Sequence, residues 1–130
     1  MVIPKKILIV EDDPRSLKMI QMTLRSYGYS LLEATDGEEA LKVARNDKPD
    51  LIIMDLRLPK VSGLEVTRQL RQMSDFNHIA IIAITAYAMK GDKEKAISAG
   101  CDAYLAKPIN TRELPKLVTE MLLQRKENST

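Results

Sequence analysis

Carboxylate, hydroxyl and ammonium side chains directly follow four of the apolar runs in this sequence. The residues are Glu11, Asp12 and Asp13 after Ile7–Val10, Asp55 after Leu51–Met54, Thr85 after Ile79–Ile84, and Lys107 after Ala103–Ala106. Carboxylates that gather at one place repel, since two unit charges about 4 Å apart cost about 4 kcal/mol at an effective dielectric of about 20. A hard divalent cation relieves this repulsion, and Mg²⁺ prefers one or two carboxylates together with waters and a phosphate. These residue types therefore predict a magnesium-dependent site.

A site that holds both Mg²⁺ and a lysine suits a phosphoryl group, because both cations neutralise the charge on its oxygens. Thr85 adds a hydroxyl that can donate a hydrogen bond to a phosphoryl oxygen. One carboxylate must then accept the group, and Asp55, at the end of the central apolar run, is the expected nucleophile. Asp13 is expected instead to cap a helix that begins at Pro14.

The apolar runs before these residues are typical of strands that are buried on both faces, as in a parallel sheet. Ser30–Ala34 and Ala103–Ala106 are weaker strands by the same pattern. Helical spacing of apolar residues fills the intervals, and it is poorest between Asp92 and Ala99. The order is strand then helix, five times, which predicts right-handed crossovers and a three-layer α/β fold. Ligands bind outside the carboxyl ends of the strands in such sheets, so the four groups of residues should meet at one rim.

The start of the last helix has two interpretations. Asn110 and Glu113 resemble a capping box, but Pro115 would then break an internal hydrogen bond of the helix. Alternatively, the helix begins near Leu114 and places Pro115 in its first turn. The spacing of the residues does not decide between these two starts.

Length and composition bound the class of protein. The 130 residues suit one domain, which we expect to span residues 1–125 and to end in a loose polar tail at 126–130. With 45% apolar and 29% charged residues, the chain is globular rather than disordered. The net charge of +2 does not favour nucleic acid as a partner, and no apolar run is long enough to span a membrane. A single cysteine, Cys101, and the lack of an export signal predict a cytoplasmic protein.

The ordered motifs resemble the receiver domain of bacterial two-component response regulators, which has the CheY-like fold. The resemblance is carried by Ile7–Asp13, Pro49–Pro59, Ser62–Gly63, Ile84–Ala86 and Ala99–Ile109. These motifs occur in the order and spacing of the family, and the resemblance covers most of the chain. It implies a doubly wound, flavodoxin-like sheet of five parallel strands in the order 2-1-3-4-5, with five helices. It also implies a phosphorelay protein that catalyses only its own phosphorylation and dephosphorylation, rather than an enzyme acting on a separate substrate.

Residue by residue, the resemblance implies a metal site and a phosphorylated aspartate. Asp55 is then the residue that carries the phosphoryl group. Asp12 and Asp55 bind Mg²⁺ directly, the backbone carbonyl of Arg57 is a further ligand, and Glu11 acts mostly through water. Mn²⁺ or Ca²⁺ are possible substitutes for Mg²⁺.

The resemblance also implies a switch. Lys107 pairs with the phosphoryl group, and its peptide bond to Pro108 is expected to be cis. Thr85 forms a hydrogen bond with the phosphoryl group and moves toward it, and Tyr104 turns inward when Thr85 moves. Arg57 and Tyr87, two residues beyond Asp55 and Thr85, flank the path of the attacking water, so their bulk is expected to slow hydrolysis.

The implied partners are proteins. A histidine kinase or a phosphotransfer protein donates the phosphoryl group, and a downstream protein binds the face formed by the helix near 92–99, the strand 103–106 and the last helix. Ser62–Val66 and Thr85–Asp92 look most like the stand-alone DivK type and the receivers of hybrid histidine kinases. If the chain is a whole gene product, we expect a single-domain regulator without a DNA-binding output domain.

Three rival classes fit the sequence less well. A phosphatase of the haloacid dehalogenase type needs a second acid two residues after its nucleophile, where this chain has Arg57. A nucleotide-binding module needs a glycine-rich loop after the first strand, where this chain has the acidic residues Glu11–Asp13 before a proline. A receiver-like scaffold that never accepts phosphate would not need the full set of acidic, hydroxyl and ammonium groups.

Overall fold

The structure, a computed structural model, describes residues 3–86 and 89–128. Its strands are β1 (Lys6–Val10), β2 (Ser30–Ala34), β3 (Leu51–Asp55), β4 (Ala80–Thr85) and β5 (Ala103–Ala106). Its helices are α1 (Pro14–Arg25), α2 (Gly37–Asp47), α3 (Gly63–Gln72), the short 3₁₀ helix η1 (Ser74–Phe76), α4 (Asp92–Ala99) and α5 (Glu113–Asn128). Strand and helix alternate along the chain, as the sequence predicts.

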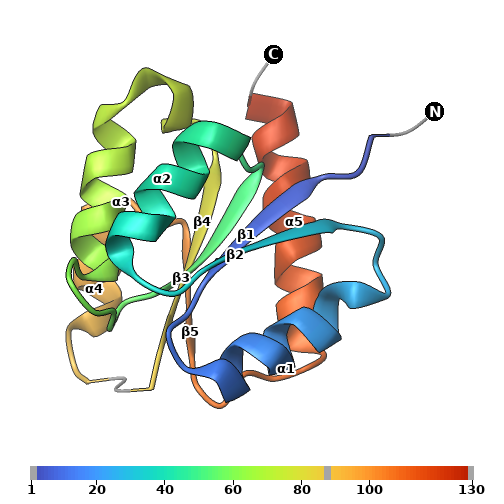
Figure 1. The fold of residues 1–130 in the computed structure, drawn as a ribbon, viewed down its shortest axis with the longest axis horizontal. Helices are drawn as coiled ribbons and strands as arrows, with labels where there is room; N and C mark the ends of the chain where they lie inside the picture. Colours follow the sequence, from blue (N-terminus) through green and yellow to red (C-terminus); the bar gives the residue numbers. More distant parts are fainter. Residues whose placement is uncertain (1–2, 87–88, 129–130) are drawn as a thin grey trace.

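The five strands form one parallel sheet in the order β2-β1-β3-β4-β5, which confirms the expected strand order. Helices cover both faces of the sheet: α1 and α5 pack on one face, and α2, α3 and α4 pack on the other (Figure 1). The fold is therefore the expected three-layer, doubly wound α/β architecture. No helix in the described part of the chain is both long enough and apolar enough to cross a membrane.

Side chains alternate between two apolar cores along each inner strand. In β1, Leu8 and Val10 face α2, α3 and α4, whereas Ile7 and Ile9 face α1 and α5. Since both faces of the sheet are covered, every residue of β3 and β4 is buried. This double burial explains why these strands are apolar throughout instead of alternating with polar residues.

The pairing register brings the carboxyl ends of the strands to one rim. Asp55, the last residue of β3, pairs with Ile84, and Thr85 at the end of β4 pairs with Ala106. β1 also ends at this rim, because Val10 pairs with Met54 just before Asp55. The residues that follow β1, β3, β4 and β5 therefore meet at one edge of the sheet.

Capping residues explain where the first and last helices begin. The carboxylate of Asp13 accepts a hydrogen bond from the backbone N–H of Arg15, so Asp13 caps α1 as predicted. The side chain of Asn110 accepts hydrogen bonds from the backbone N–H groups of residues 112 and 113, at 2.8 and 3.0 Å. α5 begins at Glu113, and Pro115 lies in its first turn, where a residue without an N–H is tolerated. The cap and the favourable proline position thus coexist.

Two features of the structure differ from the sequence prediction. The sequence pattern did not predict η1, a single turn that follows α3. The loose tail was predicted to start at residue 126, but α5 continues through Asn128. Residues 123–128 include leucine, glutamine, arginine, lysine and glutamate, which are good helix formers, and extending an existing helix adds a hydrogen bond for each residue. Of the predicted tail, only residues 129 and 130 lie beyond the described helix.

Candidate functional site

Three carboxylates from two strands meet at the rim. Glu11 and Asp12 directly follow β1, and Asp55 ends β3. One carboxylate oxygen of each residue lies within 4.8 Å of the other two. Glu11 is fully buried, Asp55 is 4% exposed, and Asp12 is exposed. The cluster therefore has a buried base and one carboxylate open to solvent.

Lys107 supplies the positive charge that these carboxylates need. It follows β5, and its side chain is only 15% exposed. Its ammonium lies 3.1 Å from Oδ2 of Asp55 and also contacts Oε1 of Glu11. Its backbone N–H donates to the carbonyl of Thr85 at 2.8 Å, and its peptide bond to Pro108 is cis, as expected. Lys107 is thus held by its backbone as well as by its charge.

The backbone after β3 fixes the orientation of Asp55. Oδ1 of Asp55 accepts a hydrogen bond from the backbone N–H of Arg57 at 2.9 Å, while Oδ2 faces Lys107. The N–H of Gly63 donates to the carbonyl of Leu56 at 3.1 Å, which closes the loop from 56 to 62. A Cβ at position 63 would lie 2.2 Å from the carbonyl oxygen of Asp55, so only glycine permits this approach of α3. Gly63 belongs to the Ser-Gly motif that follows this strand in the sequence.

Burial and charge shift the protonation of the two most enclosed groups. Burial raises the pKa of Glu11 to about 7; contact with Asp55 adds to the rise, whereas Lys107 and the N–H of Asp13 oppose it. Burial alone would lower the pKa of Lys107, but its hydrogen bond to Glu11 and the charge of Asp55 outweigh burial and raise that pKa. Lys107 therefore stays charged at neutral pH, whereas the charge of Glu11 depends on pH near neutrality.

The donor set fits a magnesium ion. All three acidic side chains offer hard carboxylate oxygens, which Mg²⁺ prefers over nitrogen or sulfur donors. Oε1 of Glu11 is buried and accepts no hydrogen bond of normal geometry from the described residues, although the ammonium of Lys107 contacts it. A buried carboxylate oxygen without a full set of donors is stabilised by a nearby cation. The exposed Asp12 leaves the side of the site that faces solvent accessible to water ligands.

The remaining predicted site residues surround this cluster. Thr85, at the end of β4, is 2% exposed, and Arg57 is exposed. Both line a cleft of about 550 Å³ that also contacts Asp12. Tyr104 on β5 is half-buried against the core under α2, α3 and α4, and burial, with Asp92 and Glu94, raises its pKa. Tyr87 lies outside the described residues.

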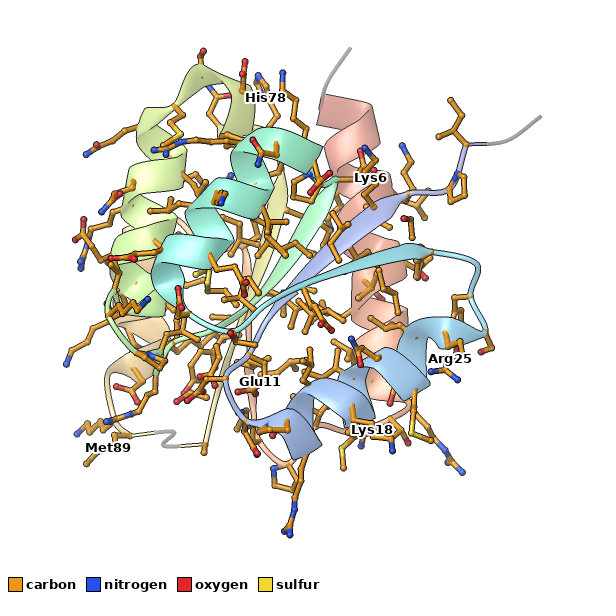
Figure 2. All side chains as sticks on the ribbon, in the orientation of Figure 1. Lys6, Glu11, Lys18, Arg25, His78 and Met89 are labelled. Carbon is orange, nitrogen blue, oxygen red and sulfur yellow. The ribbon has the colours of Figure 1, made fainter. Side chains whose placement is uncertain are left out.

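The opposite end of the sheet carries none of these groups. Figure 2 shows Glu11 at the carboxyl end of the strands, while Lys6 and His78 lie at the other end. His78, the single histidine, is therefore remote from the acidic cluster. Cys101 is buried beside Thr67 on α3, and burial raises the pKa of its thiol to about 11, so it is an unreactive core residue.

A doubly wound parallel sheet with an acidic rim and an adjacent lysine defines a class of signalling domain, and sequence comparison identifies the family. The model of the family described as "Response regulator receiver domain" matches residues 7–119. The chain belongs to this family of CheY-like domains, which act in two-component signalling.

Individual relatives agree with this assignment. The polar-differentiation response regulator DivK of Brucella anthropi is 47% identical over 107 residues, which cover 82% of this chain and 87% of that protein. The receiver domain of a sensor histidine kinase from Pseudomonas aeruginosa, solved with magnesium in its active-site cleft, is 38% identical. It superposes with a TM-score of 0.85 over 92% of this chain and 98% of its own. A CheY-like receiver protein from Methanospirillum hungatei is 29% identical and superposes with a TM-score of 0.90 over 97% and 99% of the two chains.

Proposed function

We propose that this chain is a phosphoacceptor. Asp55 accepts a phosphoryl group from a phosphohistidine of a histidine kinase or phosphotransfer protein, and the modified domain changes its contacts with other proteins. One observation carries the proposal: the carboxylate of Asp55 lies 3.1 Å from the ammonium of Lys107, at a rim shared with Glu11 and Asp12. A nucleophile beside a fixed cation, with further carboxylates to hold a metal, is the arrangement that phosphoryl transfer requires.

The transfer is an in-line displacement at phosphorus. A carboxylate oxygen of Asp55 forms the new P–O bond as the P–N bond to the donor imidazole breaks, and the electron pair of that bond stays on the imidazole nitrogen. Lys107 and the hydroxyl of Thr85 stabilise the charge on the phosphoryl oxygens. The N–H of Arg57, bonded to Oδ1 of Asp55 at 2.9 Å, keeps the carboxylate in place during the attack.

Magnesium is the expected cofactor. Asp12 and Asp55 would hold the ion directly, with the backbone carbonyl of Arg57 as a further ligand and Glu11 acting mainly through water. When bound, Mg²⁺ supplies charge neutralisation and polarisation of the acceptor and phosphoryl oxygens. The same oxygen donors would also accept Mn²⁺ and, with looser geometry, Ca²⁺.

The proposed output is a shift between two conformers. Thr85 and Lys107 would form new hydrogen bonds to the phosphoryl group, and Tyr104 would then pack inward. Moving a population from 1:99 to 99:1 needs about 5.5 kcal/mol, of which two charge-assisted hydrogen bonds of roughly 1.5–3 kcal/mol each supply a large part. The face of α4, β5 and α5 would present the change to a downstream protein. Within α4 only Ala96 and Ala99 are buried, so this helix shifts at low cost.

Labelling with a small phosphodonor tests the proposal. Wild-type protein treated with radiolabelled acetyl phosphate should acquire an acid-stable, base-labile label only when Mg²⁺ is present, and Asp55→Asn should abolish it. Asp13→Asn is the matched control, because it changes an exposed carboxylate at the same rim and keeps a residue that caps α1. Label that persists in Asp55→Asn would move the nucleophile elsewhere, and an unlabelled wild type would favour a scaffold that never accepts phosphate.

A further inference from the structure

The loop between β3 and α3, residues 56–62, is held at two places. Its base lies at the site: the N–H of Arg57 donates to Asp55, and Gly63 closes the loop by donating to the carbonyl of Leu56. Its outer part, which we call the 59–61 turn, packs against the beginning of α2. Arg57 thus lies in the loop between these two attachments.

The 59–61 turn has a backbone conformation that residues with a side chain rarely adopt. Lys60 has a φ of 68°, and the N–H of Val61 donates to the carbonyl of Pro59 at 2.8 Å. A hydrogen bond between residues two apart, around a central residue of positive φ, is the pattern of a strained γ-turn. Such strain persists only when the surrounding structure holds it.

The beginning of α2 provides that support. The ammonium of Lys60 lies 3.5 Å from Oδ2 of Asp36, the residue that caps α2, and 3.6 Å from Oε2 of Glu38 in its first turn. Gly37 lies directly against the turn, where a Cβ would lie 2.4 Å from the carbonyl oxygen of Val61. Charge attraction thus holds the turn against α2, and the glycine at position 37 leaves room for this close approach.

We propose that Lys60 is a positioning residue for magnesium: its ion pairs with Asp36 and Glu38 hold the 59–61 turn and so place the carbonyl of Arg57 for the ion. This inference rests on the proposed function, because it takes that carbonyl as a ligand. The sequence contained no signal for it, since Lys60 is one of twenty basic residues and its partners lie more than twenty positions away. Exposed ion pairs are individually weak, so the expected effect is a two- to fivefold change in affinity, on the order of what such pairs contribute.

Magnesium binding alone, measured by isothermal titration calorimetry, tests the role of Lys60. Lys60→Met should raise the dissociation constant of Mg²⁺ by about two- to fivefold. Lys60→Arg should retain the wild-type value, because it keeps the charge. Glu38→Gln, which removes one of the two ion pairs without altering the turn, should produce a smaller rise. The labelling rate at saturating Mg²⁺ should stay at the wild-type value, since Lys60 acts on metal binding and does not touch the phosphoryl group.

Lys48 offers a closely matched control. It is the other described residue with a side chain and a positive φ, 46°, and its ammonium lies 3.8 Å from an exposed carboxylate of Asp75. It ends α2, whereas Lys60 contacts the beginning of that helix, so Lys48→Met removes the same charge far from the loop. The Mg²⁺ affinity of the Lys48→Met protein should equal that of wild type.

Each outcome bears on a separate proposal. Equal Mg²⁺ affinity in wild type and Lys60→Met overturns the positioning role, and so does an equal loss in Lys48→Met, since the loss would then not depend on the 59–61 turn. If circular dichroism shows that Lys60→Met does not fold, Glu38→Gln decides, and wild-type affinity in that variant overturns the role. The proposed function fails separately, when wild-type protein binds Mg²⁺ yet Asp55 acquires no label.

Discussion

The magnesium affinity of the wild-type protein should weaken about tenfold between about pH 8 and about pH 6. Burial and the neighbouring Asp55 raise the pKa of Glu11 to about 7, so this carboxylate is mostly ionised at the higher pH and mostly protonated at the lower. A protonated Glu11 withdraws one negative charge from a cluster whose oxygens lie within 4.8 Å of one another. If the ion selects the ionised form, two pH units around that pKa change the apparent dissociation constant by about tenfold.

Titration calorimetry at the two pH values, in a buffer that does not bind the metal, measures this change. Glu11→Gln is the control, because its amide has nearly the same shape and never titrates. It should bind Mg²⁺ more weakly than wild type at about pH 8, and with nearly equal affinity at both pH values. A wild-type dissociation constant that changes by less than about twofold, or a Glu11→Gln protein with the same change as wild type, would refute the reasoning.

The raised pKa of Glu11 also predicts how the stability of the metal-free protein depends on pH. A carboxyl whose pKa is raised in the folded state favours folding most below its ordinary pKa of 4.5, and this contribution is lost as the pH rises through about 7. A shift of this size corresponds to about 3 kcal/mol, as an order of magnitude. In buffer that contains a metal chelator, the free energy of unfolding of wild type should therefore fall relative to that of Glu11→Gln as the pH rises from about 4.5 to about 7. Urea unfolding measures this difference. Hydrogen bonds lower the pKa of Asp13 and of Asp36. These two carboxylates therefore stabilise the fold above their ordinary pKa of 3.8, and their contribution is lost as the pH falls below it.

Three variants test other parts of the site. Lys107→Ala should keep the fold but uncouple phosphorylation from partner binding, because the ammonium beside Asp55 and Glu11 is lost; equal partner affinity in the phosphorylated wild-type and variant proteins would contradict this. Trimming both Arg57 and Tyr87 to alanine should shorten the lifetime of the phosphorylated protein severalfold, since their bulk is expected to obstruct water; an unchanged lifetime measured by loss of label argues against that role. Gly63→Ala should lower the free energy of unfolding by about 1–3 kcal/mol or more, because its Cβ would meet a carbonyl oxygen at 2.2 Å; a wild-type urea midpoint would show that α3 shifts freely.

Local patterns were sufficient to predict the strands because burial acts on each strand separately, whereas the strand order was expected from the family resemblance. β3 and β4 are buried on both faces, so their apolar runs marked them as inner strands of a parallel sheet. α4 was the poorest helical pattern, and its only buried residues are the two small alanines Ala96 and Ala99. The end of α5 was misjudged, because polar composition at residues 126–128 indicated a tail while intrinsic helix propensity extends the helix.

The parallel topology of the sheet explains why part of the site could be predicted. Parallel strands all end at one rim, so Glu11, Asp12, Asp55, Thr85 and Lys107 could be placed together before any distance was known. The hydrogen bonds and ion pairs of each side chain could not be predicted, because they depend on how far each strand extends and on the loops beyond it. That Lys107 contacts Glu11 as well as Asp55, and that burial raises the pKa of Glu11 to about 7, follow only from the packed structure.

The sequence by itself determined which residues end the strands and which family the chain resembles, because apolar periodicity and ordered motifs are properties of short segments. Tertiary structure alone decided the positive φ of Lys60, its ion pairs with α2 and the contact of Gly37 with Val61. These features join segments that are distant in sequence and are held by packing around them. Their energies depend on distances between elements, which no local pattern of residues encodes.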